Sequence, residues 1–217
     1  MNTEQARFNM IEQQIRPWDV LDAGVLSLLA IVKREDFVPA AHKALAFMDT
    51  EVPLAGGQQM LAPRVEARLL QELKIARHEK VLEIGAGSGF MAALLGHRAQ
   101  SVDSLEINPE LAALATANLK RAGVMNVRVR EMDGSQGLAA EAPFDAIALS
   151  GSVAEVPQQL LNQLKVGGRL AAIVGDEPVM RAQLITRTGE ASFETRVLFD
   201  TVAPRLQGFA EHKAFSF

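Results

Sequence analysis

The chain has 217 residues, of which 48% are hydrophobic and 22% are charged, as in an ordinary soluble globular protein. At this length it can bury a sizeable core within one domain, so intrinsic disorder and a fibrous repeat are excluded. Lys and Arg number 22 against 26 Asp and Glu, giving a net charge of −4. Duplex-DNA binders usually carry a basic excess, so nucleic acid is not expected as the main partner.

The chain contains no cysteine, which excludes disulfides, thiolate metal sites and cysteine nucleophiles. The four histidines show no metal-ligand spacing, and we expect no metal. The N-terminus lacks the pattern of a secretory signal. The longest near-apolar run, Val25 to Val32, is far shorter than the ~18 residues that suggest a membrane span. We therefore expect a cytoplasmic protein without membrane contact, and the composition leaves its oligomeric state open.

The first sixty residues are typical of helices joined by loops. Phe8, Ile11 and Ile15 recur at helical spacing, and Pro17 ends that helix. A second apolar stripe follows over residues 25–32. Further along, the segment FMDTEVPLAGGQQMLAP carries two prolines and a Gly-Gly pair, which predicts an ordered loop before the next helix.

From Lys80 onward, strands alternate with helices, which predicts a doubly wound, mostly parallel sheet. The predicted strands are Lys80–Ile84, Ser101–Glu106, Val127–Glu131, Asp145–Ser150 and Arg169–Val174, separated by helices over Ser88–Ala99, from Pro109 onward, and over Val156–Leu164. Residues 182–203 predict a C-terminal antiparallel hairpin. We thus predict one Rossmann-like α/β domain over 1–217, with an N-terminal helical extension over 1–75 and the sheet core over 76–217.

The strongest local signal is the segment VLEIGAGSGF, in which a strand runs into a glycine-rich turn and then a helix. Gly85, Gly87, Ser88 and Gly89 form that turn, where glycines allow a ligand to approach the backbone and the helix start offers free amides. The dinucleotide fingerprint G-x-G-x-x-G would need its third glycine at position 90, which is Phe. The pattern instead resembles the first motif of class I S-adenosylmethionine-dependent methyltransferases.

Two further signals follow the next strands of the predicted sheet. Glu106, followed by Ile107, ends the second strand, where an acid can accept both ribose hydroxyls of an adenosine. Asp133 and Gly134 follow the third strand, where the acid can accept from an exocyclic amine and the glycine lets the adenine lie against the chain. Ligands bind beyond the carboxyl ends of such strands. The three motifs together predict an adenosine-containing ligand, with S-adenosylmethionine as the expected cofactor.

Longer segments along nearly the whole chain match one enzyme family. They are RFNMIEQQIR and KREDFVPAAHKALAFMDTEVPL in the N-terminal part, and VLEIGAGSGFMAALLG, LEINPELAALATANLKRAGVMNVRVREMDGSQG and PFDAIALSGSVAEVPQQLLNQLKVGGRLAAIVG in the core. With these segments the chain resembles the protein-L-isoaspartate O-methyltransferase family. The resemblance implies S-adenosylmethionine as methyl donor and the α-carboxylate of an isoaspartyl residue in a damaged protein or peptide as acceptor. It also implies Glu83 beside the cofactor's amino-acid end, where a carboxylate attracts the ammonium group.

The chain departs from this family on the acceptor side. Where members typically carry a Gln-Thr-Ile-Ser-Gln-Pro-like stretch, this chain reads QQMLAP, so Leu61 stands at the position of the active-site serine. Leucine has no hydrogen-bond donor or acceptor. We therefore expect Gln58, Gln59 and Ser150 to orient the acceptor instead. The ending APRLQGFAEHKAFSF differs from the family's usual ending as well.

Because of Leu61, two alternatives stay beside the isoaspartyl hypothesis. One is a methyltransferase acting on a different acceptor, such as another carboxylate or a small molecule. The other is a catalytically weak S-adenosylmethionine-binding protein with an interaction role. An NAD-dependent oxidoreductase is disfavoured by the glycine spacing and by the absence of any tyrosine from the chain.

Overall fold

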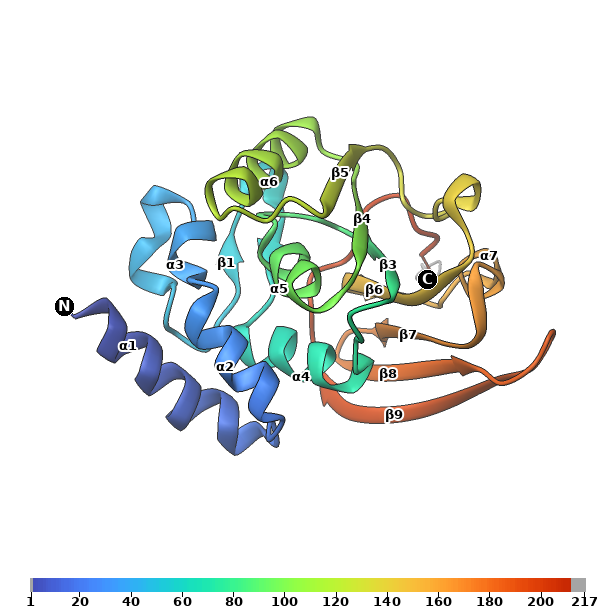
Figure 1. Ribbon diagram of the computed structural model, residues 1–217, viewed down its shortest axis with the longest axis horizontal. Coiled ribbons are helices and arrows are strands. Elements are labelled where there is room, and N and C mark those ends of the chain that lie inside the picture. Colours follow the sequence, from blue (N-terminus) through green and yellow to red (C-terminus); the bar gives the residue numbers. More distant parts are fainter. Residues whose placement is uncertain (1, 212–217) are drawn as a thin grey trace, which may run out of the picture.

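The computed structural model describes residues 2–211 and is built around a seven-stranded sheet in the order β5-β4-β3-β6-β7-β8-β9 (Figure 1). Its strands are β3 (Lys80–Ile84), β4 (Ser101–Glu106), β5 (Val127–Glu131), β6 (Phe144–Val153), β7 (Leu164–Asp176), β8 (Val179–Arg187) and β9 (Phe193–Thr201). Strands β3 to β7 are parallel, whereas β8 and β9 are antiparallel to their neighbours. The predicted Rossmann-like α/β fold with a C-terminal hairpin is confirmed.

Seven α-helices surround this sheet in the described part of the chain. They are α1 (Thr3–Met10), α2 (Ala23–Ile31), α3 (Arg34–Phe37), α4 (Pro63–Leu73), α5 (Phe90–Arg98), α6 (Pro109–Arg121) and α7 (Gln158–Asn162). Local chemistry fixes several of their ends: Asp22 caps α2, and Asn108 caps α6 just before Pro109. The predicted loop contains a small hairpin, β1 (Val52–Pro53) with β2 (Gln59–Met60). No helix within residues 2–211 is long and apolar enough to cross a membrane.

The two faces of the sheet are covered by separate apolar clusters. Side chains alternate between them along a strand, so that Val81 belongs to one cluster and Leu82 to the other. The first cluster joins the sheet to α4 and α5 and, farther out, to α2 and α1; Figure 1 shows α1 and α2 on the outer side of α4 and α5. The second joins it to α7 and to the segment after β9. A sheet buried on both faces in this way exposes its strand ends, and the site lies there.

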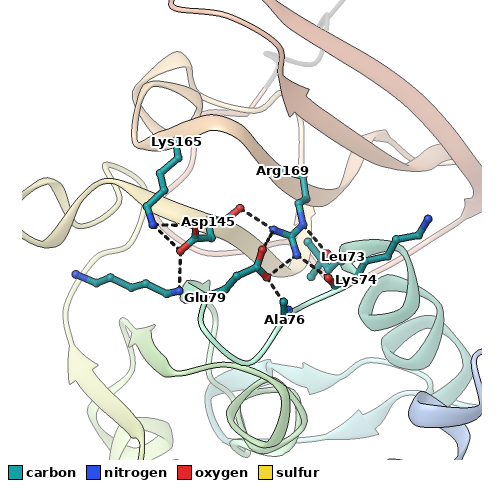
Figure 2. Close-up of polar contacts among 8 residues, drawn as sticks. Leu73, Lys74, Ala76, Glu79, Asp145, Lys165 and Arg169 are labelled. Carbon is teal, nitrogen blue, oxygen red and sulfur yellow. Dashed lines mark hydrogen bonds and ion pairs between the residues drawn. The ribbon is translucent and has the colours of Figure 1, made fainter.

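A charged network ties the strand starts together at the opposite end of the sheet (Figure 2). Arg169 donates to both carboxylate oxygens of Glu79, at 2.6 and 2.7 Å, and to the carbonyls of Leu73 and Lys74 at the end of α4. Burial alone would raise the pKa of Glu79, but hydrogen bonds from Arg169 and from the Ala76 amide hold it below its usual range. The network therefore fastens α4 to the sheet.

We expect Arg169→Ala to lower the free energy of unfolding by about 3 kcal/mol, because a mostly buried carboxylate and the carbonyls of Leu73, Lys74 and Asp145 lose this donor. Urea denaturation measures this. Arg128→Ala is the control, since the Arg128 side chain is 68% exposed and lies 3.9 Å from its partner carboxylate, and we expect about 0.5 kcal/mol or less. Equal losses of unfolding free energy in the two variants would show that the hydrogen bonds of Arg169 do not stabilise the fold as described.

The same network predicts a pH dependence. The pKa of Glu79 is lower in the folded state than its ordinary value of 4.5, so the unfolded chain takes up this proton first as the pH falls. The stabilisation is therefore complete above pH 4.5 and is lost as the pH falls through the lower folded value. Glu79→Gln should flatten this part of the stability curve.

Candidate functional site

The predicted motifs meet at the carboxyl ends of the parallel strands, where the strand order reverses between β3 and β6. Ligands of open α/β sheets bind at such a switch point. A small cavity of about 40 Å³ lies there, lined by Leu54, Gln58, Gln59, Ile84, Gly85, Gly87, Leu105, Glu106, Ile107, Leu111, Gly134, Ser150, Leu206 and Gln207. Of the twelve site residues expected from the sequence, eight line this cavity, and Glu83, Ser88, Gly89 and Asp133 lie around it.

The glycine-rich turn after β3 forms one wall of the cavity. Gly85, Gly87 and Gly89 have φ angles of +92°, +53° and +83°, in the left-handed region that other residues rarely adopt. A Cβ atom at Gly89 would lie 3.2 Å from the backbone of Ala115 in α6, so this glycine lets two helices approach. Ser88 is buried, and its carbonyl accepts from Asn118. Helix α5 begins at Phe90, because the left-handed φ angles of Gly87 and Gly89 keep these turn residues out of the helix.

Glu106 at the end of β4 forms the second wall and is only 5% exposed. One of its carboxylate oxygens accepts from the Gly87 amide at 2.8 Å, and the other accepts from the Asn108 amide at 3.0 Å. Each oxygen of an ionised carboxylate has two lone pairs, so each keeps one acceptor position. This arrangement fits two ribose hydroxyls. The neighbouring Ile107 is more exposed and also lines the cavity.

The segment after β5 contributes Gly134 to the cavity but directs Asp133 elsewhere. A Cβ atom at Gly134 would lie 2.5 Å from Ile84, so only glycine fits against the end of β3. Asp133 is exposed, and its carboxylate accepts from the Ser135 amide at 2.8 Å. It does not line the cavity. A direct contact between Asp133 and an adenine amine stays a prediction.

Glu83 lies behind the cavity wall and is completely buried. Its carboxyl oxygens are hydrogen-bonded to the Ser104 hydroxyl at 2.5 Å and to the Ser150 hydroxyl at 2.8 Å. Burial raises the pKa of Glu83 to about 8; the two hydroxyls lower it, and the charges of Glu66 and Glu106 raise it further. Glu83 therefore reaches the cavity through Ser150, and a direct contact with a cofactor ammonium stays a prediction.

Gln58, Gln59 and Ser150, the three residues expected to orient the acceptor, all line this cavity, and their role toward an acceptor stays a prediction. Leu61 is not among the lining residues. Its side chain is 3% exposed and belongs to the apolar cluster, and its carbonyl accepts from Arg34 at 2.8 Å. The position of the family's serine is thus filled by a core side chain, and Ser150 is the one hydroxyl residue among those that line the cavity.

Sequence patterns did not reveal the segment after β9 as part of the site. The Ser152 amide donates to the Pro204 carbonyl at 2.7 Å, and the Leu206 amide donates to the Ser152 carbonyl at 2.9 Å. This pairing places Leu206 over the glycine turn, 2.6 Å from where a Cβ atom of Gly85 would stand. The differing chain ending noted in the sequence begins here, and its residues 212–217 lie outside the described ones.

Because Leu206 narrows the cavity, we expect Leu206→Ala to tighten the binding of S-adenosylhomocysteine, by roughly threefold to tenfold. Removing a side chain that must move aside lowers the cost of entry. Isothermal titration calorimetry measures the affinity, and Val202→Ala on the same segment is the control, since Val202 is exposed and does not line this cavity. Weaker binding in Leu206→Ala would show instead that Leu206 packs onto the ligand.

The chain is similar to known proteins of one enzyme family. The family model "Protein-L-isoaspartate(D-aspartate) O-methyltransferase (PCMT)" matches residues 5–203. A protein-L-isoaspartate O-methyltransferase of Koribacter versatilis is 41% identical over 83% of this chain and 81% of its own length. Protein-L-isoaspartate O-methyltransferase 1 of Syntrophobacter fumaroxidans is 39% identical over 91% of this chain and 92% of its own.

A solved structure shares the fold. It is that of a Plasmodium falciparum protein described as a putative protein-L-isoaspartate O-methyltransferase in complex with S-adenosyl-L-homocysteine, with a TM-score of 0.79. The likeness covers 95% of this chain and 99% of that one at 21% identity, so it bears on the fold alone. On the family match and the relatives, the chain belongs to the protein-L-isoaspartate O-methyltransferase family of S-adenosylmethionine-dependent methyltransferases.

Proposed function

We propose that the protein transfers a methyl group from S-adenosylmethionine to the α-carboxylate of isoaspartyl residues in damaged proteins or peptides. The observation that carries this proposal is identity of about 40%, over most of the chain, to relatives that bear the name of that activity. The geometry supports it, because the glycine turn, Glu106 and the polar residues of the acceptor side line one cavity.

The donor side of the site would be held by the chain's backbone and one carboxylate. The turn from Gly85 to Gly89 would lie against the cofactor, Glu106 would accept from its ribose hydroxyls, and Gly134 would lie against its adenine. When bound, S-adenosylmethionine supplies an electrophilic methyl group on a sulfonium. The close contacts that a Cβ would make at Gly85 and Gly134 support glycine at both positions.

The acceptor side needs no general base. A carboxylate is already ionised at pH 7, so its oxygen can form the new bond to the methyl carbon while the sulfur–carbon bond breaks and its electron pair stays on sulfur. Orientation and exclusion of water then account for most of the rate. The side-chain amides of Gln58, Gln59 and Gln207 and the hydroxyl of Ser150 are donors in the cavity wall that a carboxylate can use.

A second function, methyl transfer to another carboxylate, is favoured by one observation: Leu61 provides no hydroxyl and its side chain is buried. One orienting hydrogen bond is worth about 1.5–3 kcal/mol, or roughly 10- to 200-fold in rate. The test offers labelled S-adenosylmethionine with an isoaspartyl peptide or with small carboxylic acids. Calorimetric binding of S-adenosylhomocysteine on the same preparation separates an inactive protein from a misfolded one. Label in a small acid, with none in the peptide, would select the second function.

We further propose a cellular compartment and a domain organisation for this activity. The absence of cysteine fits a reducing compartment, and we place the activity in the cytoplasm. One apolar cluster contains residues from Met10 to Ala203, which supports treating 1–217 as one domain. In this arrangement the extension over 1–75 supplies the acceptor-side residues Gln58 and Gln59 to the core over 76–217.

A further inference from the structure

We propose that Glu83 is a positioning residue, which holds the Ser150 hydroxyl in place to donate a hydrogen bond to the acceptor carboxylate. This inference rests on the proposed function. It identifies Ser150 as the residue that supplies a hydroxyl to the acceptor, in place of the serine that the family resemblance predicts at Leu61. It assigns Glu83 a role toward the acceptor, separate from any contact with the cofactor's amino-acid end.

The first support is the position of the two residues on adjacent central strands. Glu83 on β3 pairs in register with Ala148 on β6, and Ile84 pairs with Leu149, so Ser150 stands beside the turn that follows β3. Ser150 lines the cavity, with its Cβ 3.8 Å from where a Cβ atom of Gly85 would lie. A donor here faces the glycine turn from the acceptor side.

The second support is that the buried Glu83 carboxyl group reaches the cavity only through the Ser150 hydroxyl. It is completely buried, and each of its oxygens already has a hydroxyl partner, Ser104 from β4 and Ser150 from β6. Because both partners come from neighbouring strands, the carboxyl group is held in one orientation. Of the two hydroxyls, only that of Ser150 reaches the cavity, since Ser104 is completely buried as well.

The third support is the proton balance of this pair. A hydroxyl can donate only one hydrogen bond. An ionised Glu83 would accept that bond from Ser150, so Ser150 would present only its oxygen lone pairs to an incoming carboxylate. A protonated Glu83 instead donates a hydrogen bond to the Ser150 oxygen. The Ser150 hydroxyl can then donate its own hydrogen bond to the acceptor carboxylate. Burial raises the pKa of Glu83 to about 8, so the protonated form prevails at neutral pH.

The charges around Glu83 agree with this state. Glu106 at the end of β4 and Glu66 in α4 both raise its pKa, and Arg34 from α3 is paired with Glu66 rather than with Glu83. No cation is among the groups that shift Glu83. Glu83 is therefore expected to be protonated and uncharged, so it does not repel an anionic acceptor that is bound to Ser150.

The test measures the affinity of an isoaspartyl peptide for the protein saturated with S-adenosylhomocysteine, together with kcat/KM for methyl transfer. We expect Ser150→Ala to weaken peptide binding and lower kcat/KM about 10- to 100-fold, with S-adenosylhomocysteine affinity changed by less than about twofold. Ser150→Thr restores the hydroxyl and should recover most of the loss. Ser104→Ala is the matched control, which removes the other partner of Glu83 and should cost much less.

The pH profile separates positioning from a structural role. For the wild type, kcat/KM should fall as the pH rises through about 8, where Glu83 ionises. Glu83→Gln keeps a neutral donor and should remove this fall, whereas Glu83→Ala should lose kcat/KM at every pH. Release of S-adenosylhomocysteine is the assay, because it does not depend on the lifetime of the methyl ester.

Stability measurements test the protonation independently of activity. A pKa raised in the folded state means that wild-type stability falls between pH 4.5 and about 8, and Glu83→Gln should lessen this fall. If the wild type methylates the peptide but Ser150→Ala binds and turns it over normally, the inference is wrong and the proposed function stands. If the wild type binds S-adenosylhomocysteine but neither binds nor methylates the peptide, the proposed function fails and the inference falls with it.

Discussion

Glu106→Ala is expected to weaken the binding of S-adenosylmethionine and S-adenosylhomocysteine about 100- to 1,000-fold, because two ribose hydroxyls lose a charged acceptor, at roughly 1.5–2 kcal/mol each. The effect has a second source in the structure. The amides of Gly87 and Asn108 both donate to this carboxylate, so its removal also releases the glycine turn from the end of β4.

Calorimetry with S-adenosylhomocysteine measures the change, and the chain offers a matched control in Glu131. This residue pairs in register with Glu106 at the end of the neighbouring strand β5, but it is exposed and does not line the cavity. Glu131→Ala should leave the affinity within about twofold, as for an ordinary surface substitution. Glu106→Gln, which keeps the shape but not the charge, should lie between the two. An unchanged affinity in Glu106→Ala would contradict the placement of the ribose.

The second large effect is expected for Arg34→Met, which should lower the free energy of unfolding by about 3–5 kcal/mol. Arg34 is buried, forms an ion pair with Glu66, and donates to the carbonyl of Leu61. Its guanidinium also stacks over the ring of Phe90, 5.1 Å from the ring centre. The substitution leaves a buried carboxyl group unpaired and frees the chain that follows Gln58 and Gln59.

The double variant Arg34→Met/Glu66→Leu tests this explanation. Replacing both members of a buried pair by apolar side chains is often close to neutral, so the double variant should recover a large part of the loss. Burial raises the pKa of Glu66 to about 7 although Arg34 lowers it, so wild-type stability falls as the pH rises from 4.5 towards 7. Without Arg34 the folded-state pKa of Glu66 should rise further, so this fall in stability should extend to higher pH. A double variant no more stable than Arg34→Met would contradict the account.

Local sequence rules predicted several of the cavity-lining residues at the ends of β3, β4 and β5, although Asp133 and Glu83 do not line the cavity. The glycines after β3, the acid that ends β4 and Gly134 after β5 are each marked by short patterns, and a parallel sheet brings strand ends together without further information. The helix start at Pro109 follows from local chemistry in the same way, with Asn108 as its cap. These features depend on neighbours in sequence, and a single chain is enough to recognise them.

The acceptor side depends on contacts between distant residues, and the sequence gives no pattern for them. Leu206 reaches Gly85 because its backbone pairs with Ser152 at the end of β6. Nothing near Glu83 in the sequence indicates that Ser104 and Ser150 occupy both of its oxygens. The buried place of Leu61 likewise follows from Arg34, which lies in another helix. Each contact is decided by packing.

The most direct test of the central claim is the ratio of kcat/KM for an isoaspartyl peptide to that for the same peptide with a normal aspartyl residue, with labelled S-adenosylmethionine as donor. We expect label in the isoaspartyl peptide, loss of that label in Glu106→Ala, and none above background in the aspartyl peptide. Equal labelling of the two, or tight binding of S-adenosylhomocysteine without transfer to either, would contradict the claim.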